Sequence, residues 1–105
     1  MAEETKLTYH FDWDPVKAQS NLAEHKVSLR LAGSVFRDPL ATTIFDEEHS
    51  EEEERWVTLG QAENGQYLVA IHTFHQTSPT EATIRIISAR QATRREIQDY
   101  QEKPR

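Results

Sequence analysis

The chain has 105 residues, which is enough for one domain with a modest core, and it has no cysteine. The lack of cysteine excludes disulfides and thiolate metal sites and fits a reducing cytoplasm. No apolar run approaches the ~20 residues that a membrane-spanning helix needs, and the acidic N-terminus lacks the apolar core of a signal peptide. We therefore expect a cytoplasmic protein with a single domain over 1–105, in which residues 1–6 form a flexible tail.

Charge is distributed unevenly along the chain. There are 12 basic and 18 acidic residues, a formal net charge of −6 that argues at first against a nucleic-acid partner. Seven of the acidic residues form one run: Asp46, Glu47, Glu48, Glu51, Glu52, Glu53 and Glu54. From Arg85 onward, the chain has six basic residues and three acidic ones. Because screening confines a local field to about 8–10 Å, this basic end can bind phosphate although the total charge is negative.

The first half predicts one short strand and two helices. Residues 8–13 alternate roughly and suit a strand. Asp14-Pro15 predicts the start of a helix that runs to about Lys26, with Asp14 as N-cap and Pro15 as the first helical residue. Its expected apolar stripe is Val16, Leu22 and Ala23. Ser28 predicts the start of a shorter helix that ends before Pro39, with Leu31, Val35 and Phe36 facing inward.

The second half predicts four strands and a helix. The strands are expected at 41–45, 55–60, 67–74 and 83–89, with a hairpin turn at Asn64-Gly65 and a loop around Ser78-Pro79. Thr93 and Glu96 form a capping-box pattern that predicts a helix over 94–102. We therefore expect an α+β fold. It has an antiparallel sheet of about four strands, to which the short N-terminal strand could add. Two N-terminal helices pack on one face, and a C-terminal helix follows.

Symmetric hairpins would place His72 beside two arginines. A two-residue turn at Asn64-Gly65 sets Val57 opposite His72, and symmetry about Ser78-Pro79 sets Arg85 opposite His72. One face then carries Arg55, Val57, Leu59, Leu68, Ala70, His72, Arg85 and Ile87. The other carries Trp56, Thr58, Val69, Ile71, Ile84 and Ile86, and as the more apolar face it should lie under helices.

Two interpretations are open both for the four arginines between residues 85 and 95 and for His72. Arg85, Arg90, Arg94 and Arg95 lie on a strand and at a capped helix N-terminus, which suits a phosphate or carboxylate site, although they could instead pair only with glutamates. His72 could be a hydrogen-bonded core histidine, or a neutral base kept so by a neighbouring cation.

Two other groups of residues have simpler explanations. Asp46, Glu48 and His49 could ligate a divalent ion, but the spacing is not that of an EF-hand, and a solvated loop explains the acidic run better. A helical first half is an alternative, because Glu is a good helix former. His25 and Lys26 suit the C-terminal dipole of the first helix. We therefore predict no metal site and no cofactor.

Five segments, in order over most of residues 9–100, resemble the BrnT family of type II toxin–antitoxin ribonuclease toxins. The segments are Phe11-Asp12-Trp13-Asp14-Pro15 with Lys17; residues 21–28; residues 35–40; His49-Ser50 through Glu53-Glu54-Arg55-Trp56; and residues 84–96 with Tyr100. The run from Arg85 to Arg90, followed by Thr93-Arg94-Arg95-Glu96, is the most specific. Two features depart from the family pattern: a longer loop from Phe74 to Ala82, and Glu52 where glycine is common.

The resemblance implies a RelE-like fold and a cytoplasmic endoribonuclease that inhibits translation and growth. It also implies a BrnA-like, DNA-binding antitoxin with which the chain forms a hetero-oligomer. Such ribonucleases use the 2′-hydroxyl of the RNA without a metal. We expect His72, Arg85 and Arg90 to be catalytic, and Arg55, Arg94, Arg95 and Lys26 to bind RNA. The alternative is a non-enzymatic module that binds an acidic protein or operator DNA through the same basic surface.

Overall fold

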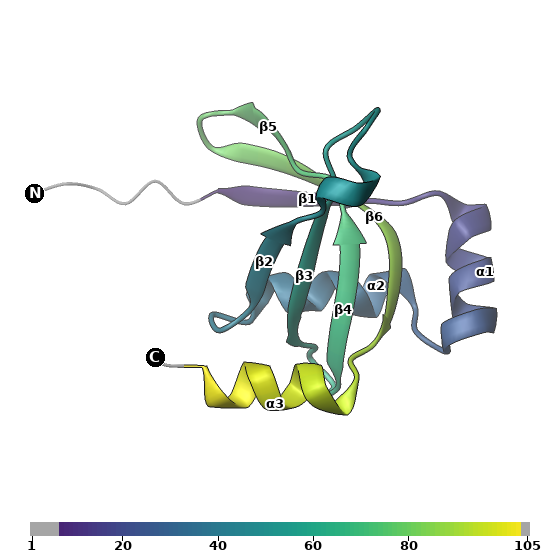
Figure 1. Cartoon of the computed structure of the whole chain (residues 1–105). Helices are drawn as coiled ribbons and strands as arrows, with labels where there is room; N and C mark the ends of the chain where they lie inside the picture. Colours follow the sequence, from purple (N-terminus) through teal and green to yellow (C-terminus); the bar gives the residue numbers. More distant parts are fainter. Residues whose placement is uncertain (1–6, 104–105) are drawn as a thin grey trace, which may run out of the picture.

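A computed structural model describes residues 7–103 and contains six strands and three α-helices (Figure 1). In chain order the elements are β1 Thr8–Asp12, α1 Pro15–His25, α2 Leu29–Gly33, the 3-10 turn η1 Ser34–Arg37, β2 Thr42–Phe45, the 3-10 turn η2 Glu47–His49, β3 Trp56–Gln61, β4 Tyr67–His72, β5 His75–Ser78, β6 Glu81–Gln91 and α3 Arg94–Glu102. The expected tail at 1–6 lies outside the described residues. The α+β class is as predicted.

The sheet is mixed, which corrects the expectation of an antiparallel sheet. Its strand order is β1-β6-β4-β3-β2, with β5 also paired to β6, and β1 runs parallel to β6 while the other pairs are antiparallel. The long strand β6 has β1 and β5 on either side of its first part and β4 along its second part. The partner of β1 is therefore about 70 residues away in sequence, which a local pattern cannot indicate.

The helix starts predicted from capping residues are confirmed. Asp14 accepts a hydrogen bond from the backbone N–H of Val16 at 2.9 Å, and Ser28 accepts one from Leu31 at 3.0 Å. Thr93 and Glu96 form the reciprocal capping box at the start of α3. These short polar contacts fix the residue at which each helix begins.

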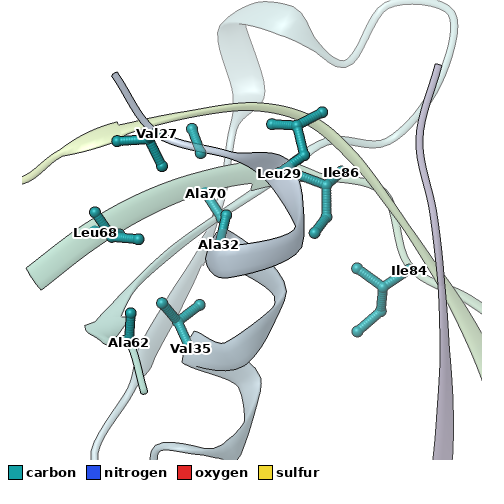
Figure 2. Packing of buried hydrophobic residues seen from close by; sticks show 10 residues of the cluster. Val27, Leu29, Ala32, Val35, Ala62, Leu68, Ala70, Ile84 and Ile86 are labelled. Carbon is teal, nitrogen blue, oxygen red and sulfur yellow. The ribbon is translucent and has the colours of Figure 1, made fainter. Parts of the chain in front are cut away.

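The core lies between α2 and one face of the sheet, as Figure 2 shows. Buried side chains from the α2 region meet buried side chains of β4 and β6: Val27, Leu29, Ala32 and Val35 on one side, Leu68, Ala70, Ile84 and Ile86 on the other. Helix α3 lies over the opposite face, where Tyr100 contacts Tyr67 edge-on. The helices therefore cover both faces of the sheet.

Helix α1 packs against the edge of β6 through a polar residue. Asn21 is buried, accepts a hydrogen bond from the N–H of Ala89 at 3.0 Å and donates to its carbonyl oxygen at 2.8 Å. The side chain thus takes the place of a neighbouring strand beyond the end of β1. The predicted apolar stripe is wrong, because Val16 is 69% and Leu22 51% exposed.

The hairpin between β3 and β4 has a longer loop than predicted, and this changes the register. Gln61 pairs with Tyr67, and within the loop Gly65 donates to the carbonyl of Ala62 while holding φ at 90°. This is a type I turn followed by a left-handed glycine, which adds one residue to a two-residue hairpin. As a result, His72 lies opposite Trp56 and not opposite Val57.

The register between β4 and β6 differs by one residue as well. The turn after β5 pairs Ser78 with Glu81, and His72 lies opposite Ile86 and not opposite Arg85. Because side chains alternate along a strand, His72 moves to the face that α2 covers, while Arg85 stays on the other face.

Candidate active site

A small polar cavity of about 90 Å³ brings three basic side chains together from three parts of the chain. Lys17 comes from the first turn of α1, Arg55 from the residue before β3, and Arg85 from β6; Asp14 and Glu53 also line the cavity. Arg55 and Arg85 therefore share a site, as the sequence predicted, on the face opposite α2.

The surroundings of these cations leave them available to an anion. Arg55 is half-buried, while Lys17 and Arg85 are exposed. Within residues 7–103, none of these three side chains makes a hydrogen bond or an ion pair with a protein group. Cations gathered in a concave site without paired carboxylates favour binding of a phosphate or carboxylate group.

The acidic loop beside this cavity places a histidine close to it. A second cavity, of about 340 Å³, is lined by His49 and its neighbours and shares Glu53 and Arg55 with the first. The Asp46 carboxylate lies 3.0 Å from Nδ1 of His49 and so orients the ring. The first part of the loop is the three-residue 3-10 turn η2, and no α-helix forms there. No group of three His, Cys, Asp or Glu side chains suited to a metal ion occurs in the described part of the chain.

Two hydrogen bonds through Ser50 join this loop to the sheet. The Ser50 hydroxyl donates to the carbonyl oxygen of Asp46 and accepts from the backbone N–H of Arg55 at 2.9 Å. The backbone N–H of Asp46 donates to the carbonyl oxygen of Arg55, also at 2.9 Å. The loop that carries His49 is therefore fastened to the residue that supplies Arg55 to the cavity.

His72 does not lie where the sequence placed it. It is 2% exposed, its Nε2 lies 2.7 Å from the Thr58 hydroxyl and its Nδ1 lies 2.9 Å from the Thr73 carbonyl oxygen. Burial lowers the pKa of His72, the hydrogen bond to the Thr73 carbonyl opposing this in part. The cause is desolvation, not the neighbouring arginine that we expected. His72 is a hydrogen-bonded core histidine, and the expected grouping of His72 with Arg55 and Arg85 is wrong because of the register.

A β-bulge in β6 between Ile86 and Ser88 brings Arg90 to the same face as Arg85, about 16 Å further along the strand at ~3.3 Å per residue. Its guanidinium forms a two-pronged ion pair with Glu96, with N–O distances of 2.7 and 3.0 Å. The hydrogen bond from Arg90 is the main cause that lowers the pKa of Glu96 to about 2. Arg90 thereby joins β6 to α3 through the capping-box glutamate, and it is not part of the cavity.

The remaining predicted RNA contacts also lie away from the cavity. Arg94 and Arg95 are exposed on the first turn of α3, beside Arg90, and Arg95 lies 3.5 Å from Asp99. Lys26 ends α1 and donates to the Ala23 carbonyl oxygen at 3.1 Å, which is the helix-end role expected for it. The structure thus divides the predicted arginine cluster into two groups, with Arg85 near the middle of β6 and Arg90, Arg94 and Arg95 at its C-terminal end and the start of α3.

Lys17, Glu53 and His49 line the two cavities but were not among the predicted catalytic or RNA-binding residues. The signal for Lys17 was its place in the turn after Asp14-Pro15, since the capped helix start fixes the direction of the first side chains. Glu53 and His49 belong to the acidic run, which the sequence predicted to be a solvated loop because of its charge. The hydrogen bonds through Ser50 and the backbone bond from Asp46 to Arg55 show that this loop is held against the sheet.

Comparison with known proteins identifies the family. The model of the ribonuclease toxin BrnT of type II toxin–antitoxin systems matches residues 13–96, which include every residue that lines the cavity. The chain belongs to the BrnT ribonuclease toxin family. A type II system pairs its toxin with an antitoxin, so membership implies such a partner. No curated protein matches the sequence.

A solved structure of this BrnT family has the same fold. The crystal structure of the Brucella abortus ribonuclease toxin BrnT superposes with a TM-score of 0.59 at 18% sequence identity. The likeness covers 83% of this chain and 100% of the Brucella chain. No helix in the described part of this chain is long and apolar enough to cross a membrane.

Proposed function

We propose that this BrnT-family chain cleaves RNA without a metal ion, at the cavity lined by Lys17, Arg55 and Arg85. The observation that carries the proposal is the convergence of three unpaired basic side chains on one small concave site. Cleavage of a phosphodiester builds negative charge on the phosphate oxygens in the transition state, and cations already held in place stabilise that charge without reorganisation. The planar guanidinium groups of the two arginines suit the phosphate geometry.

The reaction that we propose is attack by the 2′-hydroxyl oxygen of one nucleotide on its own 3′-phosphate. A bond from this oxygen to phosphorus forms while the bond from phosphorus to the 5′-oxygen of the next nucleotide breaks. The products are a 2′,3′-cyclic phosphate and a 5′-hydroxyl end. One proton leaves the 2′-hydroxyl and one proton is given to the 5′-oxygen, so no further reactant is consumed.

Two side chains near the cations are suited to move these protons. We assign the Glu53 carboxylate as the base that takes the 2′-hydroxyl proton, because it lines the cavity with all three cations. We assign His49, oriented by Asp46, as the acid that protonates the 5′-oxygen, because its cavity shares Glu53 and Arg55 with the first. This assignment replaces our expectation that His72 is the proton-transferring residue.

We also propose that the partner is a BrnA-like, DNA-binding antitoxin that covers the cavity. A toxin that cleaves cellular RNA must be held inactive in its own host, and covering the three cations is the most direct way. An inhibitor that presents carboxylates to Lys17, Arg55 and Arg85 would neutralise charges that are costly to bury unpaired. The antitoxin would then use one part of its chain to bind its operator DNA and another part to bind the toxin.

A cleavage assay with chelator tests the proposed reaction. Protein freed of antitoxin should cleave single-stranded RNA in excess chelator and leave cyclic phosphate ends, and adding back the antitoxin should stop cleavage. The all-deoxy oligonucleotide of the same sequence, which lacks the 2′-hydroxyl, should stay intact. Activity that vanishes in chelator and returns with magnesium would rule out the mechanism. Absence of cleavage under all conditions would favour the non-enzymatic binding module.

A further inference from the structure

Aromatic side chains line a large cavity that lies outside the candidate active site. Its volume is about 520 Å³, and it is lined by residues 9–13, from β1 and just after it, and by residues of the α2–η1 segment. Tyr9, Phe11, Trp13 and Phe36 supply its rings, and Arg30 and Arg37 stand at its border; we call this set the aromatic groove. Tyr9 is 41% and Phe11 39% exposed, although rings of this size are usually buried.

The rings of the aromatic groove form a continuous surface. Tyr9 contacts Phe11 at 6.4 Å and Phe36 at 6.5 Å between ring centres, and Phe11 contacts Phe36 at 5.5 Å. These rings meet edge-on or tilted, which leaves ring faces for other planar groups. Phe74, 40% exposed, extends the surface by contacting Tyr9 at 6.5 Å. The arrangement resembles the stacking platforms of proteins that bind single-stranded nucleic acid.

Charge in the aromatic groove favours a polyanion. Both charged residues that line it, Arg30 and Arg37, are basic, although 18 of the 105 residues of the chain are acidic. Arg37 forms an exposed ion pair with Glu63 at 3.2 Å, and Arg30 makes no ion pair within residues 7–103. A groove with ring faces and guanidinium groups but no carboxylate matches unpaired bases joined by phosphates.

The position of the aromatic groove links it to the cleavage cavity. Trp13 lines the groove and the next residue, Asp14, lines the cavity, so the two sites meet at the turn from β1 into α1. Asp12 of β1 lies beside Arg85 of β6 in the parallel pairing. The cavity lies on the sheet face opposite α2 and the groove lies on the α2 side, so a nucleotide strand whose phosphate occupies the cavity would pass over the end of the edge strand β1 to reach the groove.

We propose that the aromatic groove holds unpaired RNA bases next to the phosphate that is cleaved, by stacking them on Tyr9, Phe11 and Phe36. The inference rests on the proposed function and adds a base-binding subsite to it. Tyr9 and Phe11 precede residue 13, where the family match begins, so part of this subsite lies outside the matched region. Base binding would also explain why aromatic rings are exposed on the edge strand β1, where they would otherwise favour aggregation.

Binding of an RNA that cannot be cleaved tests the aromatic groove. The probe is a fluorescent single-stranded oligonucleotide with 2′-O-methyl groups, and the readout is the dissociation constant from anisotropy. Tyr9→Ala should weaken binding by about 5- to 100-fold, the range measured for loss of one base–aromatic stack. Tyr9→Phe, which keeps the ring, should bind within about twofold of wild type. Leu22→Ala, a truncation at an exposed site on α1, should change nothing.

An oligonucleotide with abasic sites separates stacking from phosphate binding. Removing the bases should weaken binding to wild type more than binding to Tyr9→Ala, because that variant has already lost a stack. Arg30→Gln, an exposed substitution that should not disturb folding, should weaken binding and reduce its salt dependence. Circular dichroism establishes that each variant is folded.

The outcomes separate the groove from the proposed reaction. A folded Tyr9→Ala that binds the oligonucleotide as wild type does would overturn the groove proposal. It would also be overturned if Tyr9→Ala lost affinity for the antitoxin alone, since the groove would then hold a protein. If wild type binds the probe through Tyr9 but never cleaves unmodified RNA, the proposed reaction fails and the base-binding groove stands.

Discussion

His72 shows how one residue can have a structural role that looks catalytic in the sequence. Its ring is buried against Phe36 at 4.8 Å, and both ring nitrogens lie within hydrogen-bond distance of protein oxygen atoms. If Nδ1 carries the proton and donates to the Thr73 carbonyl, Nε2 accepts from the Thr58 hydroxyl, whose oxygen in turn lies 2.8 Å from that of Thr43. Protonation would replace this acceptor by a donor and put a charge in the core.

The lowered pKa of His72 predicts a loss of stability in mild acid. The unfolded chain takes up a proton near the ordinary pKa of 6.5 while the folded chain does not, so the free energy of unfolding should fall as pH drops below about 6.5. Denaturant unfolding between pH 7.5 and 5 measures this slope. His72→Gln should be less stable at pH 7.5, by about 1–3 kcal/mol, but its slope should be flatter.

Titration of wild-type protein gives a second test of His72. The NMR signal of the His72 imidazole should change at a lower pH than the signal of a histidine in an unfolded peptide. This measurement needs no variant. An equal slope in His72→Gln and wild type would show that another group controls the acid sensitivity.

At the scale of elements, Asn21 determines how α1 meets the sheet. The first part of β6 is paired with β1, and beyond it the side-chain amide of Asn21 bonds to both the N–H and the carbonyl of Ala89. The same amide group donates to the Val27 carbonyl at 2.9 Å, which fixes the chain between α1 and α2. Helix α1 carries Lys17, so this contact also sets the position of a cation in the cavity.

Replacement of Asn21 by Ala should be strongly destabilising. It would leave the N–H of Ala89 and two carbonyl oxygens without their partners in a buried place, at a cost of about 1–3 kcal/mol for each unsatisfied group. We expect the free energy of unfolding to fall by at least about 3 kcal/mol in a denaturant titration. Leu22→Ala on the same helix should cost less than about 0.5 kcal/mol, because its side chain is exposed. Similar losses in the two variants would contradict the role of Asn21 as an edge partner.

The capping residues could be read from the sequence, but the strand registers could not. Asp14, Ser28 and Thr93 act on backbone groups two or three residues away, so their pattern is local and predicts helix starts well. The register of a hairpin depends on the number of residues in its turn. The left-handed conformation of Gly65 makes this turn one residue longer than the two-residue turn that Asn64-Gly65 predicts. One residue was enough to move His72 from the predicted site into the core.

At the scale of the whole molecule, the site is made by contacts between distant parts of the chain. The prediction placed Arg55 and Arg85 on the same face, and the structure does so too. Each of the two predicted registers was wrong by one residue, and the two errors cancelled for this pair. The parallel pairing of β1 with β6, which brings α1 and Lys17 to Arg85, had no local signal. The sequence therefore predicted two of the three cations and the family, but neither the mixed sheet nor the acidic loop beside the cavity.

The proposed function requires that RNA is cleaved at the cavity of Lys17, Arg55 and Arg85. The decisive measurement is the single-turnover cleavage rate of an RNA oligonucleotide by Arg85→Ala and by Arg94→Ala, each freed of antitoxin. Arg94 is an exposed arginine outside the cavity and serves as the matched control. We expect Arg85→Ala to lose at least about 100-fold in rate, as for other groups that stabilise transition-state charge, and Arg94→Ala to stay within about twofold of wild type. A folded Arg85→Ala that cleaves at the wild-type rate, or an equal loss in Arg94→Ala, would contradict the assignment of the active site.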